Sequence, residues 1–236
     1  MQRFALFDID GTVIRWQLFH SVVSELIRRG QLSDDAAKTI HDARMTWKRR
    51  EKEDSFKTYE LVLVQAYMSA LTGLSVVQYN AAVESVFEKY KDQTYTYTRD
   101  LIRDLKAQGY ALFAISGSQQ EIVSLFASYY GFDDAIGAHL EQLNGHFTGR
   151  AQTPALDKHD ALQRLLSRHD VSTDGSIAVG DSESDLALLE AVEQPIAFNP
   201  SAGLYDIAKA RGWKIIIERK NVIYRLEPSD GSYVLA

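Results

Sequence analysis

The sequence has no cysteine and only four prolines among its 236 residues. Without cysteine the chain has no disulfide scaffold, no thiolate zinc site and no cysteine nucleophile, and a reducing compartment is favoured. No apolar run approaches the roughly 18 residues of a membrane span. The chain begins with a strand-like pattern followed by acidic residues, which is not typical of a signal peptide. We therefore expect a cytoplasmic protein that does not span a membrane.

Basic residues are in the minority. The chain has 26 Lys and Arg residues against 32 Asp and Glu residues, a formal net charge of −6. It therefore lacks the strong positive field that nucleic-acid binding uses. A short basic run at 48–50 is followed by acidic residues, and a solvated helix face explains this run better than a nucleic-acid contact. We expect no nucleic-acid partner.

The rest of the composition is typical of a globular protein. Hydrophobic residues make up 45% of the chain and charged residues 25%, which excludes disorder as the main state. The length fits one large domain, or a core domain with an insertion. Folding at this size hides roughly 70–75% of the surface of the unfolded chain, enough for a sizeable core. A monomer and a homodimer both remain possible.

The hydrophobic pattern changes along the chain. Residues 16–93 show helical periodicity, as in the stripe of Tyr79, Val83, Val86 and Tyr90. Beyond about residue 98, helical patterns alternate with short apolar strands, which are expected at 110–115, 176–180, 195–198 and 213–217. Strands separated by helices form right-handed crossovers and a parallel sheet.

The chain therefore predicts an α/β fold in which an all-helical segment is inserted after the first strand. We expect the core to comprise residues 1–14 and 95–236, and the helical insertion to comprise residues 15–94. Asn144-Gly145 is expected to form a tight hairpin turn. Residues 218–236 are interpreted as an edge hairpin or a tail.

Ligands of an open parallel sheet bind at the carboxyl ends of its strands. The first such position holds Asp8-Ile9-Asp10-Gly11-Thr12, directly after the strand at 3–8. Side chains two apart on a strand share a face, so Asp8 and Asp10 are expected to project into one site. Two carboxylates this close repel each other unless a cation or phosphate chemistry requires both. Gly11 allows a sharp turn and a close backbone approach to a ligand.

Two further positions suit an anion. Ser116-Gly117-Ser118 follows the apolar strand at 110–115, and Ser118-x-x-Glu121 predicts the capped start of a helix. A hydroxyl and free amides at a helix start suit a phosphate group. Lys158, near the start of the helix after Pro154, would supply a compact cation for a phosphate oxygen.

The fourth position is Gly180-Asp181-Ser182-Glu183-Ser184-Asp185, after the strand at 176–180. Asp181 and Asp185 are four residues apart and share one face of a helical turn. Together with the two earlier aspartates they place up to four carboxylates at one sheet edge. A hard divalent cation, most simply Mg²⁺, makes that charge tolerable.

These four motifs, in this order, resemble those of the haloacid dehalogenase superfamily. The matching segments are D-I-D-G-T at 8–12, S-G-S at 116–118, Lys158 and G-D-S-E-S-D at 180–185. The helical insertion after the first motif resembles the cap of the phosphoserine-phosphatase-like branch. The resemblance implies a Rossmann-like catalytic core, a helical cap and a phosphoric monoester hydrolase.

It also implies roles for the residues at the first motif. Asp8 would attack phosphorus and form an aspartyl-phosphate intermediate. Asp10 would give a proton to the leaving alkoxide and later take one from the attacking water. Mg²⁺ would be bound by Asp8, by the backbone carbonyl of Asp10 and by Asp181. Thr12 would support this loop.

The remaining motif residues would bind phosphate or support the metal. The resemblance assigns Ser116, the Gly117 amide and Lys158 to the phosphate oxygens. Asp185 would support the metal or orient Lys158. An aspartate at position 10 favours a phosphomonoester over a haloacid, because a halide leaving group needs no proton.

The substrate is expected to be a small phosphorylated metabolite, whose identity stays open. Phosphoserine phosphatases usually carry a glutamate where this chain has Gln17, and they use a cap arginine, for which Arg44 is one candidate. Trp16 and His20 are further candidates for the substrate pocket. Two alternatives share the same motifs: a phosphotransferase with the same aspartyl-phosphate chemistry, and a phosphate-binding protein without turnover.

Overall fold

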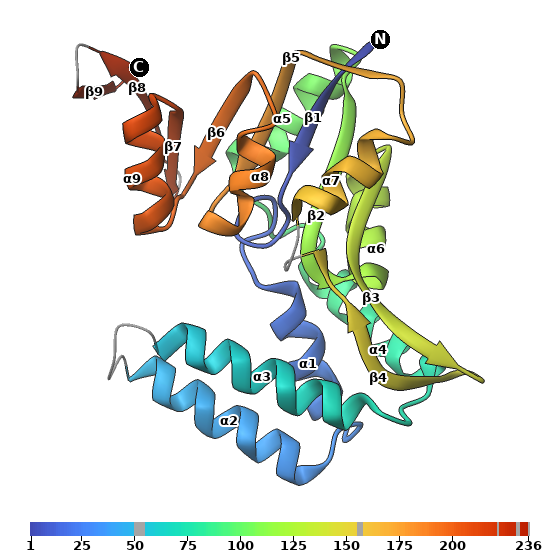
Figure 1. Cartoon of the computed structure of the whole chain (residues 1–236). Helices are drawn as coiled ribbons and strands as arrows, with labels where there is room; N and C mark the ends of the chain where they lie inside the picture. Colours follow the sequence, from blue (N-terminus) through green and yellow to red (C-terminus); the bar gives the residue numbers. More distant parts are fainter. Residues whose placement is uncertain (50–54, 155–157, 221, 230–231, 236) are drawn as a thin grey trace. The chain divides into compact units, whose positions relative to one another are not determined.

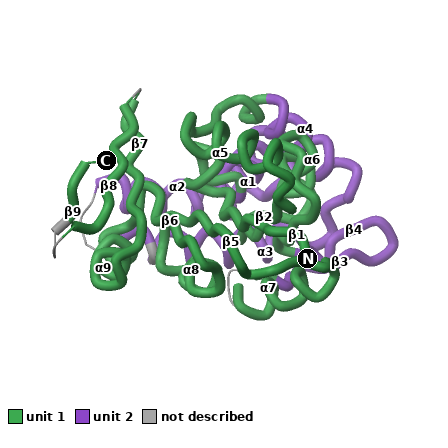
Figure 2. The backbone as a smooth tube through the Cα atoms, turned by 90° about the horizontal axis from the view of Figure 1, so that it is seen from above, with its two compact units in different colours: residues 1–18, 89–138, 153–236 green, residues 19–88, 139–152 purple. Residues whose placement is uncertain are grey.

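The computed structural model describes residues 1–49, 55–154, 158–220, 222–229 and 232–235 (Figure 1). Its chain divides into two compact units (Figure 2). Unit 1 comprises residues 1–18, 89–138 and 153–236, and unit 2 comprises residues 19–88 and 139–152. This division differs from the expected one mainly at 139–152, which sequence analysis grouped with the core.

Unit 1 is built on a mainly parallel sheet. Its strands are β1 (Gln2–Phe7), β2 (Ala111–Gln119), β3 (Asp134–Leu143), β5 (Val171–Gly180), β6 (Gln194–Phe198), β7 (Lys214–Arg219), β8 (Val222–Ser229) and β9 (Ser232–Leu235). Their order is β3-β2-β1-β5-β6-β7-β8-β9, and all neighbours up to β7 are parallel. The structure thus confirms the predicted α/β fold with a parallel sheet.

Helices cover both faces of this sheet. Their bounds are α5 (Thr96–Ala107), α6 (Gln120–Tyr130), α7 (Lys158–Leu166), α8 (Leu186–Leu189) and α9 (Ala202–Arg211), with a short 3-10 turn, η2, at Glu183–Asp185. Figures 1 and 2 show α5 and α6 on one face and α7, α8 and α9 on the other. Because both faces are covered, the central strand β1 is apolar throughout its second half, and Phe4, Ala5, Leu6 and Phe7 are fully buried.

Unit 2 contains helices α1 (Leu18–Arg28, from Phe19 onward), α2 (Asp34–Lys48), α3 (Ser55–Leu71) and α4 (Val76–Tyr90, as far as Glu88). The predicted turn at Asn144-Gly145 connects β3 to the antiparallel strand β4 (His146–Gln152), and both turn residues have positive φ, 52° and 78°. The hairpin joins this unit because Phe147 exchanges backbone hydrogen bonds with Gly73 and Leu74 and packs on Tyr79.

None of the described helices combines the length and the apolar character that a membrane span requires.

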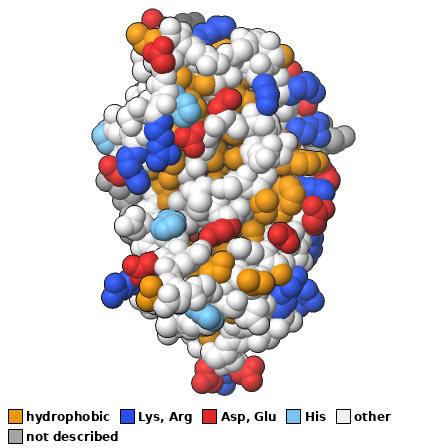
Figure 3. Space-filling view, turned by 90° about the vertical axis from the view of Figure 1, so that its right-hand side faces the viewer, with side chains coloured by type: hydrophobic (Ala, Val, Ile, Leu, Met, Phe, Trp, Pro, Cys, Tyr) orange, Lys and Arg blue, Asp and Glu red, His pale blue; other side chains and the backbone are white. Residues whose placement is uncertain are grey.

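On the face drawn in Figure 3, Lys and Arg side chains are interspersed with Asp and Glu side chains.

The carboxyl-terminal residues form the antiparallel hairpin β8–β9 at the edge of the sheet, next to β7. Its anchor is Tyr233, whose hydroxyl donates to the backbone carbonyls of Ala208 (3.0 Å) and Trp213 (2.7 Å). These carbonyls belong to the last turn of α9 and to Trp213 after it, and the Ala208 carbonyl also accepts from the Trp213 amide (2.9 Å). The hydroxyl therefore joins the edge hairpin to the helix that covers β6 and β7.

We predict that Tyr233→Phe lowers the free energy of unfolding by about 0.5–1.5 kcal/mol, because it removes the donor of these bonds. Urea unfolding at equilibrium measures the change. The matched control is Tyr224→Phe, since Tyr224 lies on the same hairpin with 41% of its surface exposed. An equal loss of stability in both variants would contradict the anchoring role.

Candidate active site

The carboxyl ends of three neighbouring strands form the site. The central strand β1 pairs in parallel with β2 and β5, so that Phe7 lies opposite Ala114 on one side and Val179 on the other. The residue after Phe7 is Asp8, whose amide donates to the Val179 carbonyl (3.0 Å). The polar residues that follow each strand therefore meet at one sheet edge.

A buried lysine connects two of the aspartates. Lys158 Nζ donates to Asp8 Oδ1 (2.8 Å) and to Asp185 Oδ1 (2.5 Å). All three side chains are buried, with 4%, 7% and 0% of their surfaces exposed. Lysine and aspartate are almost never buried unless they are paired, and here each charge has a partner of opposite sign. The sequence predicts that Lys158 binds phosphate, and in the structure it lies between two carboxylates.

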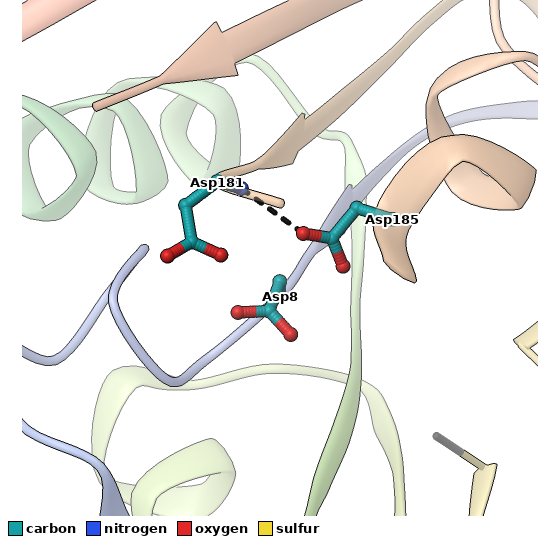
Figure 4. A group of neighbouring side chains, drawn as sticks. All are labelled: Asp8, Asp181 and Asp185. Carbon is teal, nitrogen blue, oxygen red and sulfur yellow. Dashed lines mark hydrogen bonds between the residues drawn. The ribbon is translucent and has the colours of Figure 1, made fainter. Parts of the chain in front are cut away.

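The carboxylate of Asp181 lies close to those of Asp8 and Asp185. Figure 4 shows the carboxylates of Asp8, Asp181 and Asp185 converging, with the Asp181 amide donating to Asp185 Oδ2 (3.0 Å). The Asp185 carboxylate also accepts from the Ser182 amide (3.1 Å). It thus ties the loop after β5 into a fixed turn, and this turn orients Asp181.

Two glycines let the loops approach this closely. A Cβ at Gly180 would lie 2.5 Å from the Asp185 Cβ, closer than real atoms approach. Gly11 has φ of +86°, and a Cβ there would lie 2.3 Å from Asp181 Oδ2. Larger residues at these positions would displace the carboxylates, so both glycines are needed for the geometry.

Asp10 points toward different partners. Its Oδ2 accepts from the Ser116 hydroxyl (2.6 Å), and its Oδ1 accepts from the Leu18 amide (2.5 Å). Burial raises the pKa of Asp10, and the hydrogen bonds from Ser116 and Leu18 oppose this effect. A carboxyl group held between two donors has a defined orientation, and a raised pKa lets it exchange protons nearer to neutral pH.

The charge of the site is unbalanced. Among the described residues the site holds the carboxylates of Asp8, Asp10, Asp181 and Asp185 and the ammonium group of Lys158. Burial raises the pKa of Asp8 well above its usual value, against the opposing charge of Lys158. Burial followed by the charge of Asp185 raises the pKa of Asp181 to about 7. Burial lowers the pKa of Lys158, but the carboxylates of Asp8 and Asp185 outweigh it, so the pKa of Lys158 is raised. The site therefore favours additional positive charge.

The donor set fits a hard divalent cation. One carboxylate oxygen each from Asp8, Asp181 and Asp185 lie within 4.8 Å of one another. Oxygen ligands in excess of local positive charge suit Mg²⁺ or a similar ion. The sequence predicts that the carboxylates of Asp8 and Asp181 and the backbone carbonyl of Asp10 bind the metal, with Asp185 as a supporting residue. The carboxylate cluster found among the described residues contains Asp8, Asp181 and Asp185. The Asp10 carboxylate is bound to Ser116 and Leu18, which leaves its backbone carbonyl as the predicted ligand.

The predicted helix cap at Ser118 is wrong. Strand β2 continues through Gln119, and α6 begins at Gln120 without a side-chain cap. The Ser118 side chain is hydrogen-bonded to Asp10 instead, and the Ser118 amide donates to Ser116 Oγ (2.9 Å). Ser116 is fully buried, and Gly117 lies beside it on the same strand.

The loop after Asp10 is held by a residue that sequence analysis did not single out. Thr98, on α5, is fully buried, and its hydroxyl donates to the Thr12 carbonyl (2.9 Å). Thr12 itself is fully buried, and its own hydroxyl has no hydrogen-bond partner among the described residues. A single threonine within a helical pattern gives no sequence signal for such a long-range contact.

The expected specificity residues fall in both units. In unit 1, Trp16 is half exposed, donates to Gln93 Oε1 (2.7 Å) and packs against Tyr90, and Gln17 is exposed.

In unit 2, His20 is partly buried and packs edge-on against Tyr59, and Arg44 is exposed. Burial and the charge of Arg44 lower the pKa of His20 to about 4, so its imidazole is neutral at ordinary pH.

Comparison with known proteins shows related sequences and structures. The chain is 26% identical over 210 residues to a phosphoserine phosphatase of Archaeoglobus fulgidus, which covers 88% of this chain and 55% of that protein. It is 26% identical over 227 residues to a histidinol-phosphatase of Neisseria meningitidis, covering 92% and 99% respectively. The chain spans about half the length of the first curated relatives it matches.

A solved structure of a protein of unknown function from Bordetella pertussis superposes with a TM-score of 0.75 at 26% identity, covering 92% of this chain and 99% of that chain. The model of the family described as haloacid dehalogenase-like hydrolase matches residues 5–190. That segment runs from β1, which leads into Asp8, to just beyond Asp185, so it includes the whole acidic cluster. The chain therefore belongs to the haloacid dehalogenase-like hydrolase family.

Proposed function

We propose that this protein hydrolyses small phosphate monoesters, with Asp8 as the nucleophile and Mg²⁺ as the cofactor. The observation that carries the proposal is the buried carboxylate of Asp8, the residue directly after the central strand. Its Oδ1 lies 2.8 Å from Lys158 Nζ, and its carboxylate lies beside those of Asp181 and Asp185. A fixed carboxylate among cation-binding oxygens suits in-line attack on a phosphoryl group.

Asp8 and Asp181 would bind the cation through their carboxylates and Asp10 through its backbone carbonyl, with Asp185 as a supporting residue. When bound, the cation neutralises the clustered carboxylates and polarises the phosphoryl oxygens. Lys158 favours the ionised form of Asp8, against the effect of burial, and orients its carboxylate, since the two groups form a direct ion pair. Asp8 then forms a bond to phosphorus as the bond from phosphorus to the leaving oxygen breaks.

Asp10 supplies the proton that the leaving alkoxide needs. Burial raises the pKa of its carboxyl group, so Asp10 takes up a proton more readily than an exposed aspartate does. In the second step the ionised Asp10 takes a proton from water as the water oxygen bonds to phosphorus, and Asp8 is released. Ser116 contacts Asp10 directly, so its hydroxyl lies where it bonds either to this carboxyl or to a phosphate oxygen. The Gly117 amide and Lys158 would bind the other phosphate oxygens.

The relatives suggest two substrates of the same chemical class. Several are named phosphoserine phosphatase, and a relative of which the chain covers 99% is named histidinol-phosphatase. Both names denote a small amino compound that carries one phosphate ester. Assays with L-phosphoserine and L-histidinol phosphate distinguish the two. A phosphotransferase is the alternative reaction, and transfer to added alcohols would reveal it.

We predict that the purified protein hydrolyses p-nitrophenyl phosphate with Mg²⁺ and not with EDTA. Asp8→Asn lowers kcat by on the order of 10³-fold or more, because the amide is a poor nucleophile. The release of p-nitrophenolate measures both effects. The control is Asp206→Asn, which changes an exposed aspartate on α9. Hydrolysis that persists in EDTA, or in Asp8→Asn, would overturn the proposed mechanism.

A second prediction concerns pH. Burial and the charge of Asp185 raise the pKa of Asp181 to about 7 in the folded protein without metal. Folding therefore takes up a proton at this carboxyl group, and protonation of Asp181 stabilises the folded state at low pH. This contribution to stability is lost as the pH rises through about 7. Mg²⁺ competes with these protons. The rise in Tm on adding Mg²⁺ is therefore larger near pH ~8 than near pH ~6.

Thermal melts with EDTA or MgCl₂ at the two pH values measure this difference. In the control variant Asp181→Asn the dependence on pH is expected to weaken, since the titrating carboxyl group is gone. An equal or larger stabilisation at the lower pH would show that these carboxylates do not bind the cation.

A further inference from the structure

Two segments of unit 1, residues 13–15 and 93–95, run side by side as a short antiparallel ribbon. The Arg15 amide donates to the Gln93 carbonyl (3.1 Å), and the Tyr95 amide donates to the Val13 carbonyl (3.2 Å). A backbone bridge also joins Ile14 to Thr94. These are the segments through which the chain leaves unit 1 near Leu18 and returns to it at Lys89.

The carboxylate of Glu218, near the end of β7, holds both segments. Glu218 Oε1 accepts from Arg15 Nη2 (2.7 Å) and from the Thr96 amide (3.0 Å), and Oε2 accepts from the Tyr97 amide (2.8 Å). The side chain of Glu218 is 1% exposed. The amides of Thr96 and Tyr97 begin helix α5, and Tyr95 provides no side-chain cap there. Glu218 thus caps this helix from another strand.

Arg15 completes the connection. Its Nε donates to the Thr94 carbonyl (2.8 Å), and its guanidinium lies 5.0 Å from the centre of the Tyr95 ring. One side chain therefore bonds to the returning segment and to the strand β7 at the same time. The planar guanidinium makes both bonds in a fixed geometry, which a lysine would not reproduce.

Arg15, one member of this ion pair, is close in the chain to Asp10, the proton-transferring group of the proposed mechanism. Asp10 lies in a turn whose backbone is closed by bonds from Gly11 to Ile14 (2.9 Å) and from Ile14 to Ile9 (2.9 Å). The turn leads directly into Arg15. Three residues later, the Leu18 amide donates to Asp10 Oδ1 (2.5 Å). Arg15 is therefore anchored between the Asp10 turn and the amide that orients the Asp10 carboxyl group.

We infer that Arg15 and Glu218 are positioning residues that hold the Asp10 carboxyl group in place for proton transfer to the leaving group. This inference rests on the proposed phosphatase function. Without the pair, residues 13–18 lose their connection to β7, and the Leu18 amide is no longer held against Asp10. Asp8 directly follows β1 and keeps its partners Lys158 and Val179. The pair thus affects proton donation more than nucleophilic attack.

The two effects are separable by the choice of leaving group. Phenolate has a pKa near that of a tyrosine side chain, ~10, so its departure benefits from a proton donor. p-Nitrophenolate is a much weaker base and leaves without that help. The two esters share one ring system, and kcat/KM reports the step in which this group leaves. The ratio of kcat/KM for phenyl phosphate to that for p-nitrophenyl phosphate therefore measures proton donation.

The test compares Arg15→Met and Glu218→Gln with the wild-type protein in Mg²⁺. Glu218→Gln keeps the shape of the side chain but replaces one acceptor with a donor. In each variant we expect the ratio to fall on the order of 10-fold, since small displacements of catalytic groups carry costs of that size. In the double variant the ratio of the two kcat/KM values falls no further than in the single variants, because both changes break the same interaction. Asp10→Asn, as a positive control, lowers the ratio more.

Two controls separate positioning from a general loss of stability or charge. Tyr233→Phe weakens the edge hairpin far along the chain, and Arg211→Met breaks the exposed ion pair of Arg211 with Glu190. Neither is expected to change the ratio.

An equal loss with both esters in the Arg15 and Glu218 variants, or no loss, would overturn the positioning role. If the wild-type protein hydrolyses neither ester, the proposed function fails, and the inference fails with it.

Discussion

The structure depends on the balance of charge around one buried lysine. Lys158 is paired with Asp8 and Asp185, and Asp181 lies beside them, so the site holds more negative than positive charge. An unpaired buried charge is very costly, and these groups stay buried because each has a partner or a raised pKa. The same excess of negative charge makes the site a good receptor for a divalent cation. Stability and the proposed chemistry therefore have a common electrostatic origin.

The parallel sheet brings these charges together. β1, β2 and β5 are neighbours, and Asp8, Ser116 and Asp181 come from the ends of these three strands. Gly11 and Gly180 remove the Cβ atoms that would separate the loops. Glu218, near the end of β7, bonds to Arg15 and to the Thr96 amide, and so holds the two segments through which the chain leaves unit 1 and returns to it. Residues from the ends of several strands thus meet in one site.

Much of this arrangement is predictable from local patterns. The alternation of apolar strands and helices predicts the parallel sheet, and the acidic residues after its strands predict where carboxylates gather. The contact between Arg15 and Glu218 is not predictable in this way, because two charged residues so far apart in the chain leave no periodic signal. The helix cap predicted at Ser118 is wrong because the Ser118 side chain bonds to Asp10, a long-range contact that local patterns do not include. The turn at Asn144 was predictable, but the unit that its hairpin joins was not.

The central claim is that Asp8 becomes covalently phosphorylated. The most direct measurement is to quench the protein during turnover of a phosphate ester in Mg²⁺, reduce it with borohydride and identify the modified residue by peptide mass spectrometry. Reduction of an acyl phosphate converts aspartate into homoserine, and the account predicts homoserine at position 8. Turnover that leaves Asp8 unmodified, with homoserine at another aspartate or at none, would contradict the account.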